Sequence, residues 1–200
     1  MKHIFEKGQN NQTLVLLHGT GGNEHDLLPL GKLIDPHANL LGIRGNVLEY
    51  GMPRFFKRLA MGVFDIESLK EETERLYDFI KSSSETYHFD MKHVTVIGYS
   101  NGANILGSML LHYNQAFHKA ILFHPMIPIK EIEMNNLKEV SIFIGAGKTD
   151  HMVLVDETLA LKEMFEQRGA TVDLYLTELG HQLSRDEIEH AKIWYEKSQR

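Results

Sequence analysis

The stretch from His93 to Gly102 constrains the fold of this chain more than any other. It begins with a mostly β-branched apolar run over residues 94–97, which is typical of a buried strand. It ends in a Gly-x-Ser-x-Gly motif centred on Ser100, and an apolar, helix-like segment follows over residues 103–111. This succession of strand, motif and helix predicts a turn so tight that its two glycines have no room for a Cβ atom. The serine is then expected in a strained backbone conformation, with its hydroxyl group projecting above the sheet.

Strands and helices alternate along the rest of the chain. Apolar runs predict strands at residues 2–6, 13–17, 39–43, 94–97, 120–123, 140–144 and 172–176. Apolar positions three and four residues apart predict helices over residues 24–33, from near Asp65 onward and over 103–111. A further helix is expected to carry Leu154, Leu161 and Phe165 on one face and to end at Gly169. The last helix is expected after the capping box of Ser184 and Glu187. This alternation predicts one α/β domain over residues 1–200, with a mainly parallel central sheet covered by helices on both faces.

Two further polar residues follow expected strands. In parallel sheets, ligand sites lie beyond the carboxyl ends of the strands. Asp150 comes after the sixth expected strand and His181 after the seventh. The chain order Ser, Asp, His accompanies this type of serine turn, so we predict that His181 takes a proton from Ser100 while Asp150 orients the imidazole. Asp156 and Glu178 are weaker alternatives for the acid, because Asp156 lies inside an expected helix and Glu178 lies too near His181 in sequence.

A glycine-rich segment follows the second expected strand. Gly19, Gly21 and Gly22 allow close backbone approach to a ligand. The backbone N–H groups of Thr20 and Asn101 are predicted to form an oxyanion hole. A dinucleotide loop would need a third glycine at residue 24, which is a glutamate, whereas anion binding by this loop stays open as an alternative.

Two other patterns resemble binding motifs without completing them. Gly147-Lys148-Thr149 matches the end of a phosphate-binding P-loop, but the first glycine of that motif falls on Ile142, inside an expected strand. The chain has 12 histidines, yet none forms a His-Glu-x-x-His pair, and there is no cysteine. We therefore predict neither a nucleotide nor a metal.

Several segments together resemble the α/β-hydrolases of the carboxylesterase and phospholipase branch over nearly the whole chain. They are residues 16–24, residues 98–104 and Gly180-His181. Residues 44–47, 51–56 and 124–126 bring the resemblance closer to small bacterial hydrolases, some of them linked to quinone stress. The resemblance implies a carboxylic ester hydrolase. Members of this family often carry a proline a few residues after the acid, whereas residues 151–154 here are His-Met-Val-Leu.

The surroundings of the expected site indicate an open, shallow pocket. The segment that often carries a lid in this fold, residues 124–139 here, is too short for a cap domain. The apolar side chains expected to reach the substrate are Phe55, Phe56, Met61, Phe64, Met126 and Met152, although each of them also suits a core position. For Arg44 and Arg54, contact with a substrate carboxylate and exposure to solvent both remain open.

Three functions follow from these residues. The first is hydrolysis of small carboxylic esters through an acyl-enzyme, without a cofactor. The second is thioester or lysophospholipid hydrolysis by the same residues, and the third is a catalytically silent fold that serves as a ligand receptor. A net charge of −6 without a basic block argues against nucleic acid or an anionic membrane surface as partner. The absence of cysteine, of a signal-like N-terminus and of a long apolar segment indicates a cytoplasmic protein without a membrane span. The sequence leaves a homodimer open.

Overall fold

The computed structural model describes residues 1–199, which are built around a seven-stranded sheet. Its strands, in spatial order, are β1 (His3–Glu6), β3 (Asn39–Ile43), β2 (Thr13–Leu17), β8 (Val94–Tyr99), β9 (Lys119–Phe123), β10 (Ser141–Gly147) and β11 (Thr171–Thr177). Every neighbouring pair is parallel except β1 and β3. The mainly parallel sheet predicted from the sequence is confirmed.

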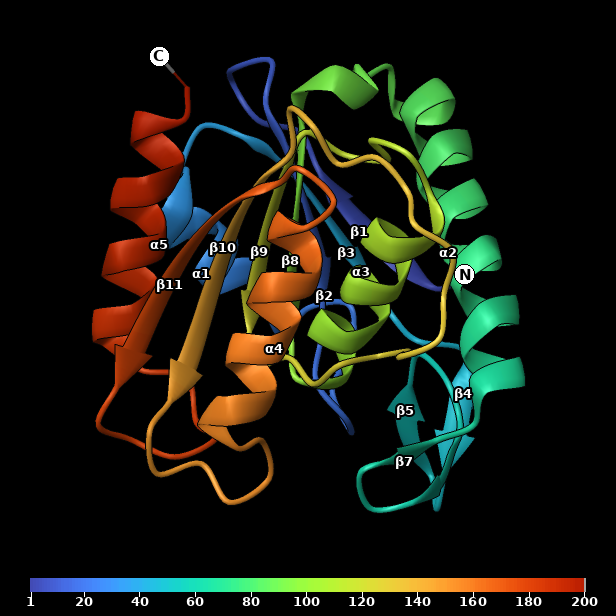
Figure 1. Ribbon diagram of the computed structural model, residues 1–200. Helices are drawn as coiled ribbons and strands as arrows, with labels where there is room; N and C mark the ends of the chain where they lie inside the picture. Colours follow the sequence, from blue (N-terminus) through green and yellow to red (C-terminus); the bar gives the residue numbers. More distant parts are fainter. Residues whose placement is uncertain (200) are drawn as a thin grey trace.

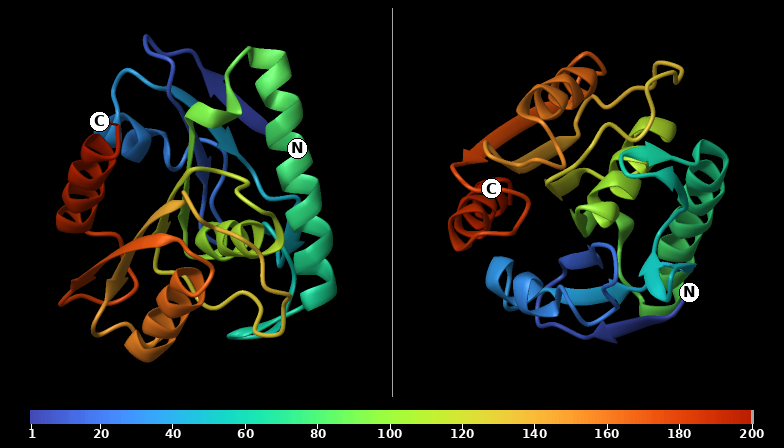
Figure 2. Two further views of the ribbon diagram at one scale, coloured as in Figure 1. Left: turned by 45° about the horizontal axis from the view of Figure 1, so that its top comes forward. Right: turned by 90° about the horizontal axis from the view of Figure 1, so that it is seen from below.

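Helices cover both faces of this sheet (Figures 1 and 2). One face carries α1 (Leu28–Ile34) and α5 (Arg185–Lys197), and the other carries α2 (Ile66–Tyr87), α3 (Asn101–His112) and α4 (Val155–Glu166). Two apolar cores result, one on each side of the strands. Because β2 and β3 contribute side chains to both cores, every residue of these strands is buried, as their continuous apolar runs predict. Within residues 1–199, no helix combines the length and apolarity that a membrane crossing needs.

The register of the strands brings their carboxyl ends to one edge. Leu17 of β2 pairs with Gly98 of β8, and Tyr99 of β8 pairs with Phe123 of β9. Phe123 in turn pairs with Gly145 of β10. The segments that leave these strands therefore begin side by side. Residues 124–140, between β9 and β10, form no helix or strand, so no cap domain covers this edge.

Two helix predictions need correction. The first helix was expected over residues 24–33, but residues 24–27 form turns and α1 begins at Leu28. The Asn23 side chain accepts a hydrogen bond from the His25 N–H at 2.9 Å, which favours a turn there, and Pro29 suits the first helical turn. Leu154 does not share the buried face of α4, because it is the N-cap residue and 65% exposed.

A segment for which the sequence predicted no structure forms two small hairpins. They consist of β4 (Val47–Glu49) with β5 (Met52–Arg54) and of β6 (Arg58–Ala60) with β7 (Val63–Phe64). The segment ends at Asp65, whose side chain accepts a hydrogen bond from the Ser68 N–H at 3.0 Å and caps α2 where the sequence predicts its start. A single-turn helix, η1 (Met91–His93), precedes β8.

Candidate active site

Ser100 occupies the tight turn between β8 and α3 that the sequence predicts. Its backbone angles are φ 50° and ψ −110°, a strained conformation for a residue with a side chain. A Cβ atom on Gly98 would lie 2.5 Å from the Gly102 carbonyl oxygen, and one on Gly102 would lie 2.1 Å from that of Leu17. Both glycines of the motif are therefore required by close packing of backbone. The Ser100 N–H donates to the Phe123 carbonyl oxygen at 2.9 Å, which ties the turn to β9.

The structure brings Ser100, His181 and Asp150 into one chain of hydrogen bonds. Ser100 Oγ lies 2.8 Å from His181 Nε2, and His181 Nδ1 lies 2.6 Å from Asp150 Oδ2. The second carboxylate oxygen, Asp150 Oδ1, accepts the N–H groups of Met152 and Val153 at 2.7 and 3.0 Å. Burial alone would raise the pKa of Asp150, but these hydrogen bonds outweigh it and hold the pKa below its ordinary value. Asp150 is therefore an anion at neutral pH, as an acid that orients a histidine must be.

The loops that carry Asp150 and His181 support each other. The N–H of Lys148 donates to the Thr177 carbonyl oxygen at 2.8 Å, and that of Thr149 donates to Leu179 at 3.1 Å. A Cβ atom on Gly147 would lie 2.2 Å from the Leu179 carbonyl oxygen, so only glycine permits this approach. The alternative acids lie elsewhere: Asp156 is in the first turn of α4, and Glu178 pairs with Lys148 on the surface.

The residues of the two expected oxyanion donors, Thr20 and Asn101, lie at the same pocket as Ser100. Asn101 is the first residue of α3, so its N–H has no acceptor within the helix. The Thr20 hydroxyl accepts a hydrogen bond from Arg54 Nη1 at 2.7 Å, and the Asn101 side chain accepts the Phe55 N–H at 2.7 Å. These bonds position both segments, while the role of the two N–H groups stays a prediction.

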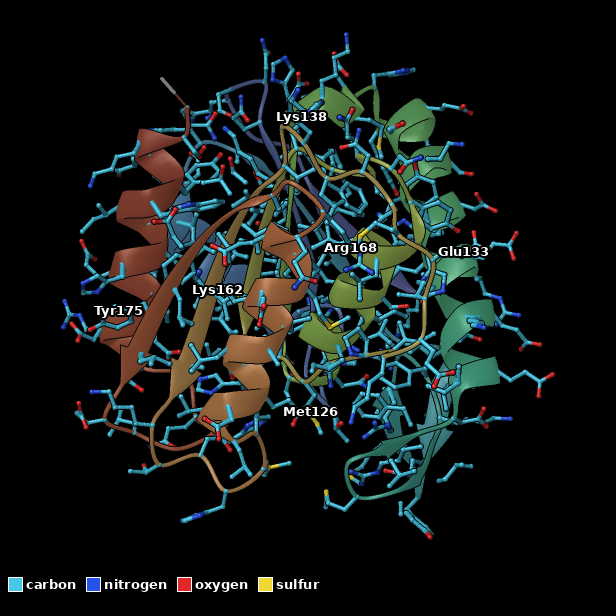
Figure 3. The ribbon with its side chains drawn as sticks, viewed as in Figure 1. Met126, Glu133, Lys138, Lys162, Arg168 and Tyr175 are labelled. Carbon is cyan, nitrogen blue, oxygen red and sulfur yellow. The ribbon has the colours of Figure 1, made fainter. Side chains whose placement is uncertain are left out.

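The pocket around Ser100 has a volume of about 350 Å³. Four of the apolar side chains expected there line it, namely Met61, Phe64, Met126 and Met152. Met126 lies at the edge of the molecule where the parallel strands end (Figure 3). A larger groove of about 650 Å³ lies between α2 and residues 129–135, but no serine, threonine or cysteine lines it.

Phe55 and Phe56 do not line the pocket, contrary to the sequence prediction. Both are fully buried. The Phe55 ring packs on His18 with ring centres 4.8 Å apart, and the Phe56 ring packs edge-on against Phe64 at 5.0 Å. The polar neighbour Arg54 reaches the pocket instead, whereas Arg44 pairs with the buried Glu24 away from it.

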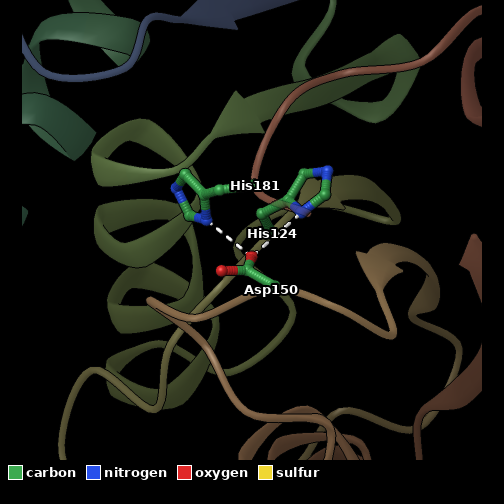
Figure 4. Close-up of side chains that lie close together, drawn as sticks. All are labelled: His124, Asp150 and His181. Atoms are coloured by element: carbon green, nitrogen blue, oxygen red, sulfur yellow. Dashed lines mark hydrogen bonds and ion pairs between the residues drawn. The ribbon is translucent and has the colours of Figure 1, made fainter. Parts of the chain in front are cut away.

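Sequence reasoning missed two buried residues behind Asp150. His124 directly follows β9 and lies beside Asp150 opposite His181 (Figure 4). Glu187 contacts the far side of His124, with 3.1 Å between Glu187 Oε1 and His124 Nε2. The sequence showed Glu187 only as part of the capping box that opens α5, which the structure confirms. The two residues lie far apart in the sequence, so no local sequence pattern indicated their contact.

The same cluster has donor atoms that suit a metal ion. One atom each from His124, Asp150 and His181 lie within 4.8 Å of one another. Here both Nδ1 atoms approach a single carboxylate oxygen, as hydrogen-bond donors do. The absence of a metal from the reaction stays a prediction.

Comparison with known proteins agrees with the fold and shows the family. The model of the dienelactone hydrolase family matches residues 57–197. MhqD of Bacillus subtilis strain 168, a protein named as a hydrolase, is 51% identical over 198 residues that cover 99% of both chains. The solved Bacillus cereus carboxylesterase is 48% identical with a TM-score of 0.97, over 99% of this chain and 94% of that one. The structure of YahD with malic acid is 34% identical with a TM-score of 0.92, over 98% of each chain.

The sheet, the serine turn and these similarities define an α/β-hydrolase, as the sequence segments suggested. The chain belongs to the dienelactone hydrolase family, and it is a hydrolase of the dienelactone hydrolase and carboxylesterase type.

Proposed function

We propose that this hydrolase cleaves small carboxylic esters through an acyl-enzyme formed on Ser100. The observation that supports it most is the unbroken hydrogen-bond chain from Ser100 Oγ through His181 to Asp150. Asp150 holds the His181 ring with its Nδ1 protonated, which leaves Nε2 free to accept the serine proton.

The reaction then has two halves. Ser100 Oγ attacks the ester carbonyl carbon as its proton moves to His181 Nε2, and the N–H groups of Thr20 and Asn101 stabilise the negative carbonyl oxygen. His181 returns the proton to the leaving alcohol as the C–O bond breaks, and the acyl group stays on Ser100. Water attacks the acyl-enzyme in the same way and releases the carboxylic acid. No step needs a cofactor.

Labelling by a fluorophosphonate tests this proposal. The protein should take up one phosphonyl group, and peptide mapping should place it on Ser100, because the probe reacts with activated serines. A protein that resists the probe and hydrolyses no ester would instead support the ligand-receptor function.

A series of substrates with increasing acyl length separates the ester and thioester or lysophospholipid functions. The pocket is about 350 Å³ and no cap domain extends it. Short acyl esters should therefore be hydrolysed about tenfold or more faster than long ones, since a long chain gains few apolar contacts. A preference for long-chain thioesters or lysophospholipids would favour the second function.

The charge of the pocket favours substrates that carry a carboxylate. Arg54, Arg58 and His151 line it, and none of the lining residues is acidic. Both arginines share one carboxylate: Arg58 binds Glu49 through two nitrogens at 2.9 and 2.7 Å, and Arg54 Nη1 lies 3.7 Å from it. Burial and the neighbouring Arg58 lower the pKa of Arg54, yet an arginine stays protonated at neutral pH. Two arginines thus face the single carboxylate of Glu49, which leaves one positive charge for a substrate anion. The relative YahD was solved with malic acid, which is a dicarboxylic acid.

Replacing Arg58 by glutamine should therefore reduce the preference for anionic esters. We expect kcat/KM for a half-ester such as monoethyl succinate to fall by about tenfold, because one charge-assisted contact is worth roughly that factor. Hydrolysis of the neutral ethyl butyrate should change little. Lys57→Gln is the matched control, because Lys57 carries the same charge next to Arg58 but does not line the pocket. Equal losses for both esters in Arg58→Gln would contradict the anionic preference.

We further propose a cytoplasmic location and a small ester as the only partner that the reaction requires. The lack of cysteine fits a reducing compartment.

A further inference from the structure

A buried pair of ionisable side chains, His124 and Glu187, lies behind the three residues proposed for the reaction. The His124 ring is fully buried between two carboxylates, with Nδ1 3.4 Å from Asp150 Oδ2 and Nε2 3.1 Å from Glu187 Oε1. Asp150 Oδ2 is the same oxygen that accepts His181 Nδ1 (Figure 4). Ser100, His181, Asp150, His124 and Glu187 thus form a continuous chain from the pocket to the first turn of α5.

A count of protons indicates the charge of His124. A neutral imidazole has one N–H donor and one acceptor nitrogen, whereas ionised carboxylates only accept. If both carboxylates are ionised, each ring nitrogen must carry a proton. Asp150 is the anion that His181 requires. Glu187 is fully buried, and within residues 1–199 its ion-pair partner is His124. A buried carboxylate without a cation is strongly destabilised, so Glu187 and His124 favour a charged pair together.

The surrounding backbone is shaped for this pair. His124 has a φ of 53°, in the left-handed region, and its N–H donates to the Gly145 carbonyl oxygen at 2.7 Å. A Cβ atom on Gly145 would lie 2.8 Å from Glu187 Oε1, so glycine makes room for the carboxylate. Glu187 Oε2 also accepts the N–H and the hydroxyl of Ser184, both at 3.1 Å. The capping box of α5 therefore fixes the carboxylate that faces His124.

We propose that Glu187 keeps the His124 imidazole doubly protonated, and that His124 holds the shared oxygen of Asp150 and limits how strongly Asp150 attracts a proton to His181. His124 and Glu187 are positioning residues, and their role in the reaction rests on the proposed esterase function. The charged pair lies on the side of Asp150 away from the substrate, and it sets the electrostatic field in which His181 works.

The other groups that face His124 leave this assignment intact. They are Asp150 after β10, Glu187 on α5, the His181 ring at 5.2 Å and the Tyr99 ring of β8 at 6.0 Å. Burial, Asp150 and Glu187 raise the pKa of Tyr99 above its ordinary value, so this phenol stays neutral. The nearest positive charge to Asp150, apart from protonated His181, is then His124.

The charge of His124 can be measured directly in the wild-type protein. Nitrogen-15 NMR of the histidine rings should show a proton on both His124 nitrogens at pH 7, because each ring nitrogen faces a carboxylate. His18 is an internal control, because it is also buried but neutral: its Nδ1 lies 2.6 Å from the Gly19 carbonyl oxygen and its Nε2 accepts the Gly45 N–H at 3.0 Å. An unprotonated nitrogen on His124 at pH 7 overturns the proposal.

Two variants test the effect on the reaction. The acid limb of the kcat/KM profile reports deprotonation of His181. In His124→Asn and in Glu187→Gln the positive charge beside Asp150 is lost, so protonated His181 is favoured and the limb should move to higher pH by about 0.5–1 unit. In Glu187→Gln the His124 ring should also lose one proton in the NMR spectrum.

A control separates this effect from altered packing. His112→Asn makes the same substitution as His124→Asn, but at the far end of α3. It should leave the limb in place, even where it lowers the melting temperature. A limb that does not move in His124→Asn and Glu187→Gln contradicts the proposal. A protein with no turnover and no fluorophosphonate labelling instead rejects the esterase function and any role of the pair in it, whereas the nitrogen spectra still decide whether the ion pair exists.

Discussion

Replacing Ser100 by alanine is expected to lower kcat/KM for a short ester by about 10⁵-fold or more, because the residues of a serine triad act as a unit. Thr20 is the only other residue with a hydroxyl among those that line the pocket, and its hydroxyl accepts a hydrogen bond from Arg54. The free energy of unfolding should change little, since the Ser100 hydroxyl contacts only His181. Fluorophosphonate labelling should disappear together with turnover. Steady-state kinetics and urea unfolding measure the two effects separately.

The matched control is Ser108→Ala, in the helix α3 that follows Ser100. Ser108 is fully buried and its hydroxyl lies 2.8 Å from the Thr73 hydroxyl, which also donates to the Leu69 carbonyl oxygen. This variant should keep its activity and lose some stability, the reverse of Ser100→Ala. Residual turnover above about 1% in Ser100→Ala would show that another group is the nucleophile, since the oxyanion hole and substrate binding alone leave far less.

The sequence predicts those parts of the fold in which both faces of an element are buried. The bounds of β2 and β3 agree with their apolar runs, because a strand inside a parallel sheet has no exposed face to interrupt the run. Ser100, Asp150 and His181 were found by their position after strands, and parallel strands place such positions at one edge. The order of these three residues along the chain thus predicted that they lie close together in space.

The surroundings of the site were harder to predict, for a physical reason. The strands of residues 47–64 have only two or three residues, too few for a hydrophobic period to show. In such hairpins, neighbouring side chains point to opposite sides, and hydrophobicity does not decide which one enters the pocket. Arg54 is the last residue of β5 and lines the pocket, while the more apolar Phe55 and Phe56, which follow that strand, both lie in the core.

Glu187 shows a second limit. Its capping box with Ser184 is a local pattern, and the sequence identified it. Its contact with His124 joins a helix and a loop that are far apart in the chain, and nothing near either residue indicates it. The sequence therefore identified the capping role of Glu187 but not its full burial.

Gly102→Ala should have a large effect on folding although it adds only a single methyl group. The added Cβ atom would lie 2.1 Å from the Leu17 carbonyl oxygen and 2.7 Å from that of His18. Both neighbours are backbone atoms of β2 and its following residue, which cannot rotate away. We expect a loss of about 3 kcal/mol or more in the free energy of unfolding, since the helix and the strand must separate.

Gly107→Ala is the control within the same helix. Its Cβ atom would lie 3.4 Å from Pro128 Cγ and 3.7 Å from Leu122 Cδ2, contacts that side chains tolerate. Alanine is the better helix former by about 1 kcal/mol, so this variant should be as stable as the wild type or more so. Urea unfolding of both variants measures the difference. If Gly102→Ala were as stable as Gly107→Ala, α3 would not pack on β2 as closely as the structure shows.

The activity of Gly102→Ala should fall with its stability, for a related reason. Moving α3 away from β2 also moves Asn101, the residue before Gly102, away from the glycine-rich segment that begins after Leu17. The N–H groups of Thr20 and Asn101 would then no longer converge on one oxygen, and losing one such donor typically costs a factor of about 10²–10³ in kcat. Because Ser100 and His181 remain, labelling by fluorophosphonate should slow down rather than disappear. That result would distinguish the role proposed for the closely packed turn, which is to set the geometry of the donors, from the role proposed for Ser100, which is to react.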